Sequence, residues 1–268
     1  MTASTLTRAS APATGSRLIG LRALLRKDAS EWLRGRRAWV VAGVVTAFMA
    51  ITTANGWINA TIAAQLPDGA EVGEFSLAAA DNLMLAVGAQ VFVLAAILAV
   101  GSLIAGERQT GTLAWVASKP VSREAIWVSK WISSSLILGL TAAAIPMAVS
   151  AGLATALYGA PPVGLVLGLV AGMVAVVTLF AAVGLAAGTV MPGQAAITAT
   201  GIGVLALVPL FASVLPFDVT PFLPTSMLTW FAGLASGMPV AWSTPVAWLA
   251  VTGALAAASM RRMSRMEL

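Results

Sequence analysis

The sequence predicts an all-α membrane protein with six transmembrane helices, and three observations support this fold class. Hydrophobic residues make up 59% of the 268 positions, and mean hydropathy is +0.92. Charged residues make up only 9%, against about 25% in ordinary soluble domains. No Asp, Glu, Lys or Arg lies between Trp131 and Phe217, or between Val219 and Met260. Stretches that long and apolar are solvated by lipid rather than water.

The predicted membrane domain covers residues 38–260 as a single unit. A membrane-spanning helix needs about 20 apolar residues, because each residue advances the helix by about 1.5 Å. Backbone groups in lipid must be satisfied internally, so each apolar window is expected to be helical. The windows that fit are residues 38–60, 83–105, 131–152, 163–188, 194–215 and 240–260.

The basic residues predict that both termini are cytoplasmic, because Lys and Arg accumulate on that side of the membrane. With six spans, all 15 Lys and Arg fall on one side: before the first span, between the second and third, and after the sixth. The opposite loops hold only acidic charges, including Asp68, Asp81 and Asp218. We therefore expect a multi-pass protein of the plasma (inner) membrane.

The segments flanking the spans have distinct compositions. Residues 1–15 are small and polar, with no export signal, and are expected to form a disordered tail. Residues 16–37 predict an amphipathic interfacial helix, with Ser16 as its N-cap and Gly35 as its stop. Its apolar face is expected to hold Leu18, Leu21, Leu25 and Trp32. The alternative is a segment that serves only to set topology. Residues 261–268 form a basic cytoplasmic tail.

The residue types present exclude several kinds of chemistry. The chain contains no His and no Cys, which removes His- or Cys-based nucleophilic catalysis and His-ligated metals. It has no Gly-x-x-x-x-Gly-Lys-Ser/Thr loop, so it lacks that means of binding ATP. Spans three to six hold no ionisable residue of the kind that ion-coupled carriers use. We expect no catalytic residue, no metal or other cofactor on this chain, and no nucleic-acid partner.

The connection from Gly106 to Lys130 carries the most informative pattern. Its ends are charged, and its middle, Thr112 to Ala117, is apolar but too short to span. This predicts a short helix under the membrane with one face offered to a partner, or a loop folded onto the chain's own helices. Its ordered elements are an acidic residue, Gly-Thr-Leu, Pro-Val-Ser-Arg and a final Lys, at Glu107, Gly111–Leu113, Pro120–Arg123 and Lys130.

These elements, together with the six-span layout, resemble the permeases of type-2 ATP-binding-cassette (ABC) exporters. The resemblance implies a permease subunit that moves substrate with ATP hydrolysed by a separate ATPase subunit, where ATP and Mg would bind. It also implies that two permease copies, identical or paralogous, work together, and that residues 107–130 include the coupling helix. The residues it assigns to ATPase coupling are Glu107, Arg108, Gly111, Thr112, Leu113, Pro120, Ser122 and Arg123. Glu107 and Arg123 would supply charges that pair across the interface.

Two further segments fit this picture. Residues 226–235 form an apolar run enclosed by prolines, which predicts a re-entrant or interfacial outer helix between spans five and six. Small residues at a spacing of four in span four predict close helix packing, within one subunit or between subunits. These are Gly164, Gly168, Gly172, Gly184 and Gly188. The alternatives to an ABC permease are a secondary carrier or channel without an ATPase, and a non-transporting membrane assembly factor.

Overall fold

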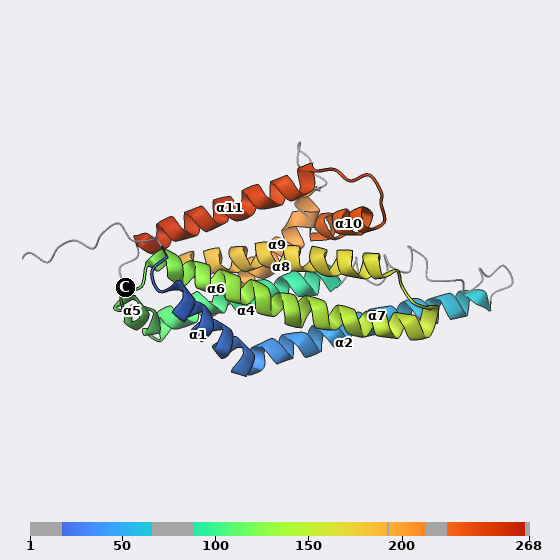
Figure 1. The fold of residues 1–268 in the computed structure, drawn as a ribbon, viewed down its shortest axis with the longest axis horizontal. Coiled ribbons are helices and arrows are strands. Elements are labelled where there is room, and N and C mark those ends of the chain that lie inside the picture. Colours follow the sequence, from blue (N-terminus) through green and yellow to red (C-terminus); the bar gives the residue numbers. More distant parts are fainter. Residues whose placement is uncertain (1–17, 66–87, 192, 213–223, 266–268) are drawn as a thin grey trace, which may run out of the picture.

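The computed structural model describes residues 18–65, 88–191, 193–212 and 224–265, and within these ranges the secondary structure is helical (Figure 1). The helices are α1 (Leu21–Arg34), α2 (Arg36–Ala64), α4 (Gly88–Gln109), α5 (Thr112–Ala117), α6 (Arg123–Leu138), η1 (Gly139–Ala144), α7 (Ile145–Tyr158), α8 (Val163–Val190), α9 (Gln194–Ala212), α10 (Pro224–Ala235) and α11 (Ser243–Ser264).

Four of the described helices are long and apolar enough to cross a membrane. They are Arg36–Asn55, the continuous run Arg123–Tyr158, Val163–Val190 and Ser243–Ser264. The expected spans at 83–105 and 194–215 lie partly outside the described residues, and the expected tail at 1–15 lies wholly outside them. The all-helical membrane fold is therefore established, while the count of six spans and the cytoplasmic termini stay predictions.

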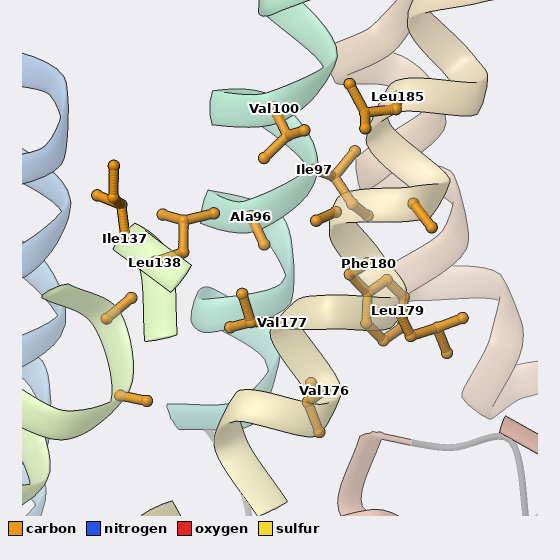
Figure 2. Packing of buried hydrophobic residues seen from close by; sticks show 14 of the residues in the cluster. Ala96, Ile97, Val100, Ile137, Leu138, Val176, Val177, Leu179, Phe180 and Leu185 are labelled. Atoms are coloured by element: carbon orange, nitrogen blue, oxygen red, sulfur yellow. The ribbon is translucent and has the colours of Figure 1, made fainter. Parts of the chain in front are cut away.

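Helix α8 lies at the centre of the described helices and packs against α4, α10, α11 and α6. It contains no charged residue, follows Pro161–Pro162 and ends just before Pro192, which cannot continue a helix. In Figure 2 the side chain of Ile97 on α4 lies beside Leu185 on α8, and Ala96 on α4 lies above Val177 on α8. All four are fully buried. The core therefore forms between helices adjacent in space but far apart in sequence.

The glycines of α8 allow its backbone to approach two neighbours closely. A Cβ added at Gly168 would lie 2.8 Å from the Phe231 carbonyl oxygen of α10. One added at Gly188 would lie 2.8 Å from the Gly101 carbonyl oxygen of α4. Of the other three, Gly164 and Gly172 also face α10, and Gly184 faces α4. All five positions are thus used for contacts inside this chain, where small residues permit tight packing.

The run from α6 to α7 includes a π-helical segment, η1, which ends at Ala144, two residues before Pro146. Proline lacks an N–H and its ring crowds the preceding turn, and a wider π-turn is one way a helix accommodates it. At the far end of α7, the Tyr158 hydroxyl donates to the Thr53 carbonyl oxygen of α2 at 3.0 Å. The helix remains continuous, and its two halves pack on different partners: α6 on α1, and α7 on α2.

Helix α1 differs from the sequence prediction in its start and in its buried face. It begins at Leu21 after Gly20, whose φ is +83°, instead of at Ser16, and it ends at Gly35 as expected. Its buried residues are Leu24, Asp28 and Trp32, whereas Leu18 is exposed. The cause is tertiary: α1 packs against α6, which offers a polar partner to Asp28.

Candidate functional site

The short helix α5 occupies the apolar middle of the 106–130 connection and has two different faces. Gly111 precedes it with a φ of +72°, a conformation that residues with a Cβ rarely adopt. Leu113 and Val116 are buried against the chain, at 0% and 6% exposure. Trp115 is 62% exposed, and the Lys119 ammonium lies 3.5 Å from the centre of its ring. The outward face therefore presents an aromatic ring with a cation over it.

The turn after α5 rests on the beginning of α1. Pro120 lies within a tight turn in which the Val121 N–H donates to the Lys119 carbonyl at 2.7 Å. The Ser122 N–H donates to the Ile19 carbonyl at 3.2 Å, and the Ser122 hydroxyl caps α6 by accepting from the Ala125 N–H. Gly20 packs so closely against Val121 that an added Cβ would lie 2.5 Å from that side chain. The connection is thus held by main-chain contacts on both sides of Val121.

A cluster of five charged side chains joins α1, α4 and α6 next to this connection. We call it the charge cluster: Lys27, Asp28, Glu31, Glu107 and Lys130. The Lys130 Nζ donates to Glu107 Oε1 at 2.8 Å and lies 3.7 Å from Asp28 Oδ1. The Ser129 hydroxyl donates to Asp28 Oδ2 at 2.7 Å. Lys130 is 4% exposed and Asp28 is 5% exposed, so this part of the cluster is almost fully removed from water.

The outer part of the charge cluster is more accessible. The Lys27 Nζ lies 3.4 Å from Glu31 Oε1, 3.7 Å from Glu107 Oε1 and 4.0 Å from Asp28 Oδ1. Burial lowers the Lys27 pKa, but the three carboxylates outweigh this effect, so the pKa lies above its usual value. For Asp28, burial raises the pKa despite the opposing effects of Lys130 and Ser129. Asp28 therefore carries its charge at a cost that its partners only partly offset.

Two arginines in this region hold the carboxyl-terminal ends of other helices. Arg108 donates to the carbonyl oxygens of Gly188 and Met191, at 3.5 and 3.4 Å, where α8 ends. Arg123 donates to the carbonyl oxygens of Met263 and Ser264, at 3.2 and 3.0 Å, at the end of α11. Positive charge at these positions is favourable, because unpaired carbonyls give a helix end partial negative charge.

The structure brings the residues predicted for coupling into one region but divides them by role. Gly111, Thr112 and Pro120 are exposed, whereas Leu113 packs inward. Glu107 and Arg123, expected to pair across an interface, also have partners inside the chain. The remaining two, Arg108 and Ser122, cap helices, as described above.

Sequence reasoning missed Asp28, Ser129 and the exposed Trp115. A signal for Asp28 was present: it lies four residues from both Leu24 and Trp32, so one helical face carries a carboxylate between two apolar residues. A carboxylate at such a position requires a buried cation, and Lys130 is that cation.

Long charge-poor helices around a glycine-packed core define the class as a multi-pass membrane protein. The sequence matches the family described as ABC-2 family transporter protein over residues 22–228. This chain belongs to that family, whose members are non-catalytic permease subunits of ABC transporters and typically carry no cofactor. Membership implies an ATPase partner. No curated protein matches the chain.

Proposed function

We propose that this chain is the permease subunit of an ABC exporter in the plasma membrane, with both termini cytoplasmic. ATP is hydrolysed on a separate ATPase subunit, and a second permease copy, identical or paralogous, completes the transporter. The observation that carries the proposal is the outward face of α5, where Trp115 is exposed and the Lys119 ammonium, from the turn after the helix, lies over its ring, while the opposite face of α5 is buried.

The exposed face of α5 has the chemistry of a contact with a partner protein. An exposed tryptophan stacked with a cation is costly to leave in water, and such residues often dominate the binding energy of an interface. Thr112 and Ala114 lie beside Trp115 on the exposed side and are small enough to let a groove close around the ring. Gly111 sets the angle at which α5 leaves α4, because its left-handed backbone redirects the chain. We therefore assign the ATPase contact to this face.

The charge cluster and the Ser122 turn supply the route from α5 to the membrane helices. Glu107 lies at the end of α4, five residues before α5, and its carboxylate accepts a hydrogen bond from Lys130 in the middle of α6. Lys130 and Ser129 in turn hold Asp28 of α1. A displacement of α5 by the ATPase would thus be passed to three helices together. In this role Glu107 and Arg123 act by holding helices in place, not by touching the ATPase.

The absence of charged residues from α8 and α9 supports an external energy source. No Asp, Glu, Lys or Arg lies between Trp131 and Phe217, a stretch that includes α8 and α9. Carriers driven by proton or sodium gradients usually hold such residues within their spans as relays or ligands. ATP hydrolysis on a partner chain supplies the work without them. The export direction follows from the resemblance of residues 107–130 to exporter permeases.

The test is co-purification of the affinity-tagged chain from its own cells in mild detergent. Four variants form two matched pairs. Trp115→Ala is compared with Trp242→Ala, since the two rings are 62% and 66% exposed. Gly111→Ala is compared with Gly106→Ala: an added Cβ meets no atom within 4 Å at either position, but only Gly111 has a positive φ.

We expect an ATPase to co-purify stoichiometrically with the unaltered chain and both controls, and to be reduced with Trp115→Ala and Gly111→Ala. Loss of an interface tryptophan costs about 2 kcal/mol or more, which is over tenfold in affinity. All four variants should remain monodisperse, because the altered side chains are exposed or absent. If well-folded preparations contain no ATPase, the proposal is wrong and a secondary carrier becomes the leading hypothesis. If Trp115→Ala retains the ATPase fully, the contact lies elsewhere.

A further inference from the structure

Two adjoining hollows lie at the junction of α1 and α2 around Gly35, which we call the elbow, and Arg36 and Arg37 line both of them. The first, of about 370 Å³, is lined by polar residues of α1 and α6 together with Arg36, Arg37 and Leu103. The second is an open groove of about 720 Å³ between α2 and α4, with Val40, Val41 and Ala99 in its walls. A hollow with charged side chains and Trp32 in its walls thus continues into a largely apolar groove, and Arg36 and Arg37 line both.

Arg36 and Arg37 are the uncompensated charges of the first hollow. Its other charged residues are Asp28, Glu31 and Lys130, and each is already paired within the charge cluster. Among the described residues, no carboxylate pairs with the guanidinium of Arg36 or Arg37. Arg37 donates a hydrogen bond to the neutral Ser102 hydroxyl at 3.3 Å. Two positive charges are therefore left for a ligand.

The surroundings of the two arginines also favour an anion. They are the first residues of α2, and no acidic residue lies in its first turn to offset the positive end of the helix. Trp32 lines the same hollow at 5% exposure, and its buried indole N–H has no acceptor among the residues that the structure describes. A buried donor of this kind requires a partner. Guanidinium groups, helix N–H groups and an indole N–H together match phosphate oxygens.

The position of the site indicates a lipid as the source of that phosphate. Trp39, Val40 and Val44 follow on α2 and are 55–59% exposed, so an apolar helix surface begins within one turn of the arginines. A tryptophan next to basic residues is typical of the interface between lipid headgroups and acyl chains. An acyl chain lying in the α2–α4 groove would cover Val40, Val41 and Ala99.

We propose that the elbow binds one membrane phospholipid, with its phosphate on Arg36 and Arg37 and an acyl chain in the groove between α2 and α4. The lipid fills the space between the interfacial helix α1 and the first membrane helix. It thereby links the charge cluster to the bilayer. The site lies outside α5 and does not depend on the proposed ATPase contact.

The test is native mass spectrometry of the purified, delipidated full chain titrated with dioleoyl-phosphatidylglycerol. Dioleoylglycerol, which has the same acyl chains and no phosphate, is the lipid control. The variant is Arg36→Gln/Arg37→Gln. Its matched control is Arg22→Gln/Arg26→Gln, because these arginines are exposed on α1 and line neither hollow. A second variant, Ala99→Phe, fills the groove and leaves both arginines in place.

We expect one tightly bound phosphatidylglycerol per chain, and binding at least about tenfold weaker in Arg36→Gln/Arg37→Gln, since two charge-assisted contacts are lost. The Arg22→Gln/Arg26→Gln control should bind as the unaltered chain does, and Ala99→Phe should bind more weakly. Equal loss in both arginine pairs would overturn the proposal, because it would indicate general surface electrostatics. Equal binding of dioleoylglycerol would overturn it too, as would binding of inorganic phosphate that the lipid does not displace.

Discussion

Replacing Lys130 by methionine tests whether the charge cluster holds the helices together. The substitution keeps the length and apolar stem of the side chain and removes only the ammonium. Lys130 is 4% exposed, and two carboxylates lie within 3.7 Å of its Nζ. Without it, Asp28 remains buried, with the Ser129 hydroxyl at 2.7 Å and the Lys27 ammonium at 4.0 Å.

The expected loss follows from the cost of a buried charge whose partner is removed. Breaking a buried ion pair from one side costs about 3–5 kcal/mol, and Lys27 compensates part of it, so we expect about 3 kcal/mol. The double variant Asp28→Asn/Lys130→Met removes the two most deeply buried charges and leaves Glu107 with Lys27 at 3.7 Å. It should recover about 2 kcal/mol of that loss, as contacting residues couple strongly. Arg26→Met, which removes an exposed cation from α1, should change stability by less than about 0.5 kcal/mol.

The assay is thermal unfolding of the purified chain in detergent, followed by tryptophan fluorescence, with all four proteins measured under the same conditions. A loss of about 3 kcal/mol corresponds to a midpoint lower by about 6–12 °C for a chain of this size. The reasoning is refuted if Lys130→Met unfolds at the same temperature as Arg26→Met, or if the double variant is no more stable than Lys130→Met. Either result would mean that the cluster does not join α1, α4 and α6.

Two further predictions concern pH and helix packing. Burial raises the pKa of Asp28 in the folded chain above its ordinary value of 3.8, so the folded chain binds a proton at Asp28 more tightly than the unfolded chain does. The protonated Asp28 therefore adds to the stability of the fold at low pH, and this contribution is lost as pH rises through the folded pKa. The unaltered chain should therefore gain stability relative to Asp28→Asn as pH falls through the folded pKa toward 3.8, and a constant difference would contradict the assignment. Gly168→Ala should cost about 1–3 kcal/mol, since the new Cβ would meet Phe231 O and Ala235 Cβ at 2.8 and 2.7 Å. Gly164→Ala should be tolerated, with its nearest atom at 3.7 Å; equal melting temperatures for the two variants would show that α10 does not pack as described.

The features set by local composition were predictable from the sequence. Helix α8 follows from an uninterrupted apolar run with small residues at a spacing of four, bounded by prolines. Helix α5 follows from an apolar segment too short to span, after a glycine, and the structure has a helix at Thr112–Ala117. Both depend on properties within a few residues, and these are what a sequence pattern records.

The features set by contacts between distant segments were not predictable. The predicted apolar face of α1 held Leu18, Leu21, Leu25 and Trp32, and of these the structure buries Trp32. Asp28 was not expected on that face, because hydrophobicity alone assigns a carboxylate to water. Asp28 is buried because Ser129 and Lys130, about 100 positions away, satisfy it. Likewise Glu107 and Arg123 were expected to contact a partner, and only the fold brings Lys130 and the end of α11 within their reach.

The hydrogen bonds from Arg123 to the end of α11, and from Ser122 to Ile19, have a practical consequence for labelling. A folded tag joined shortly before Ile19 or shortly after Ser264 would stand beside α5 and compete for space with whatever binds there. The connection between α7 and α8, around Gly159, lies at the other end of α8, about 40 Å away by helix length. An epitope inserted there would leave the α5 face open for single-molecule or cross-linking measurements.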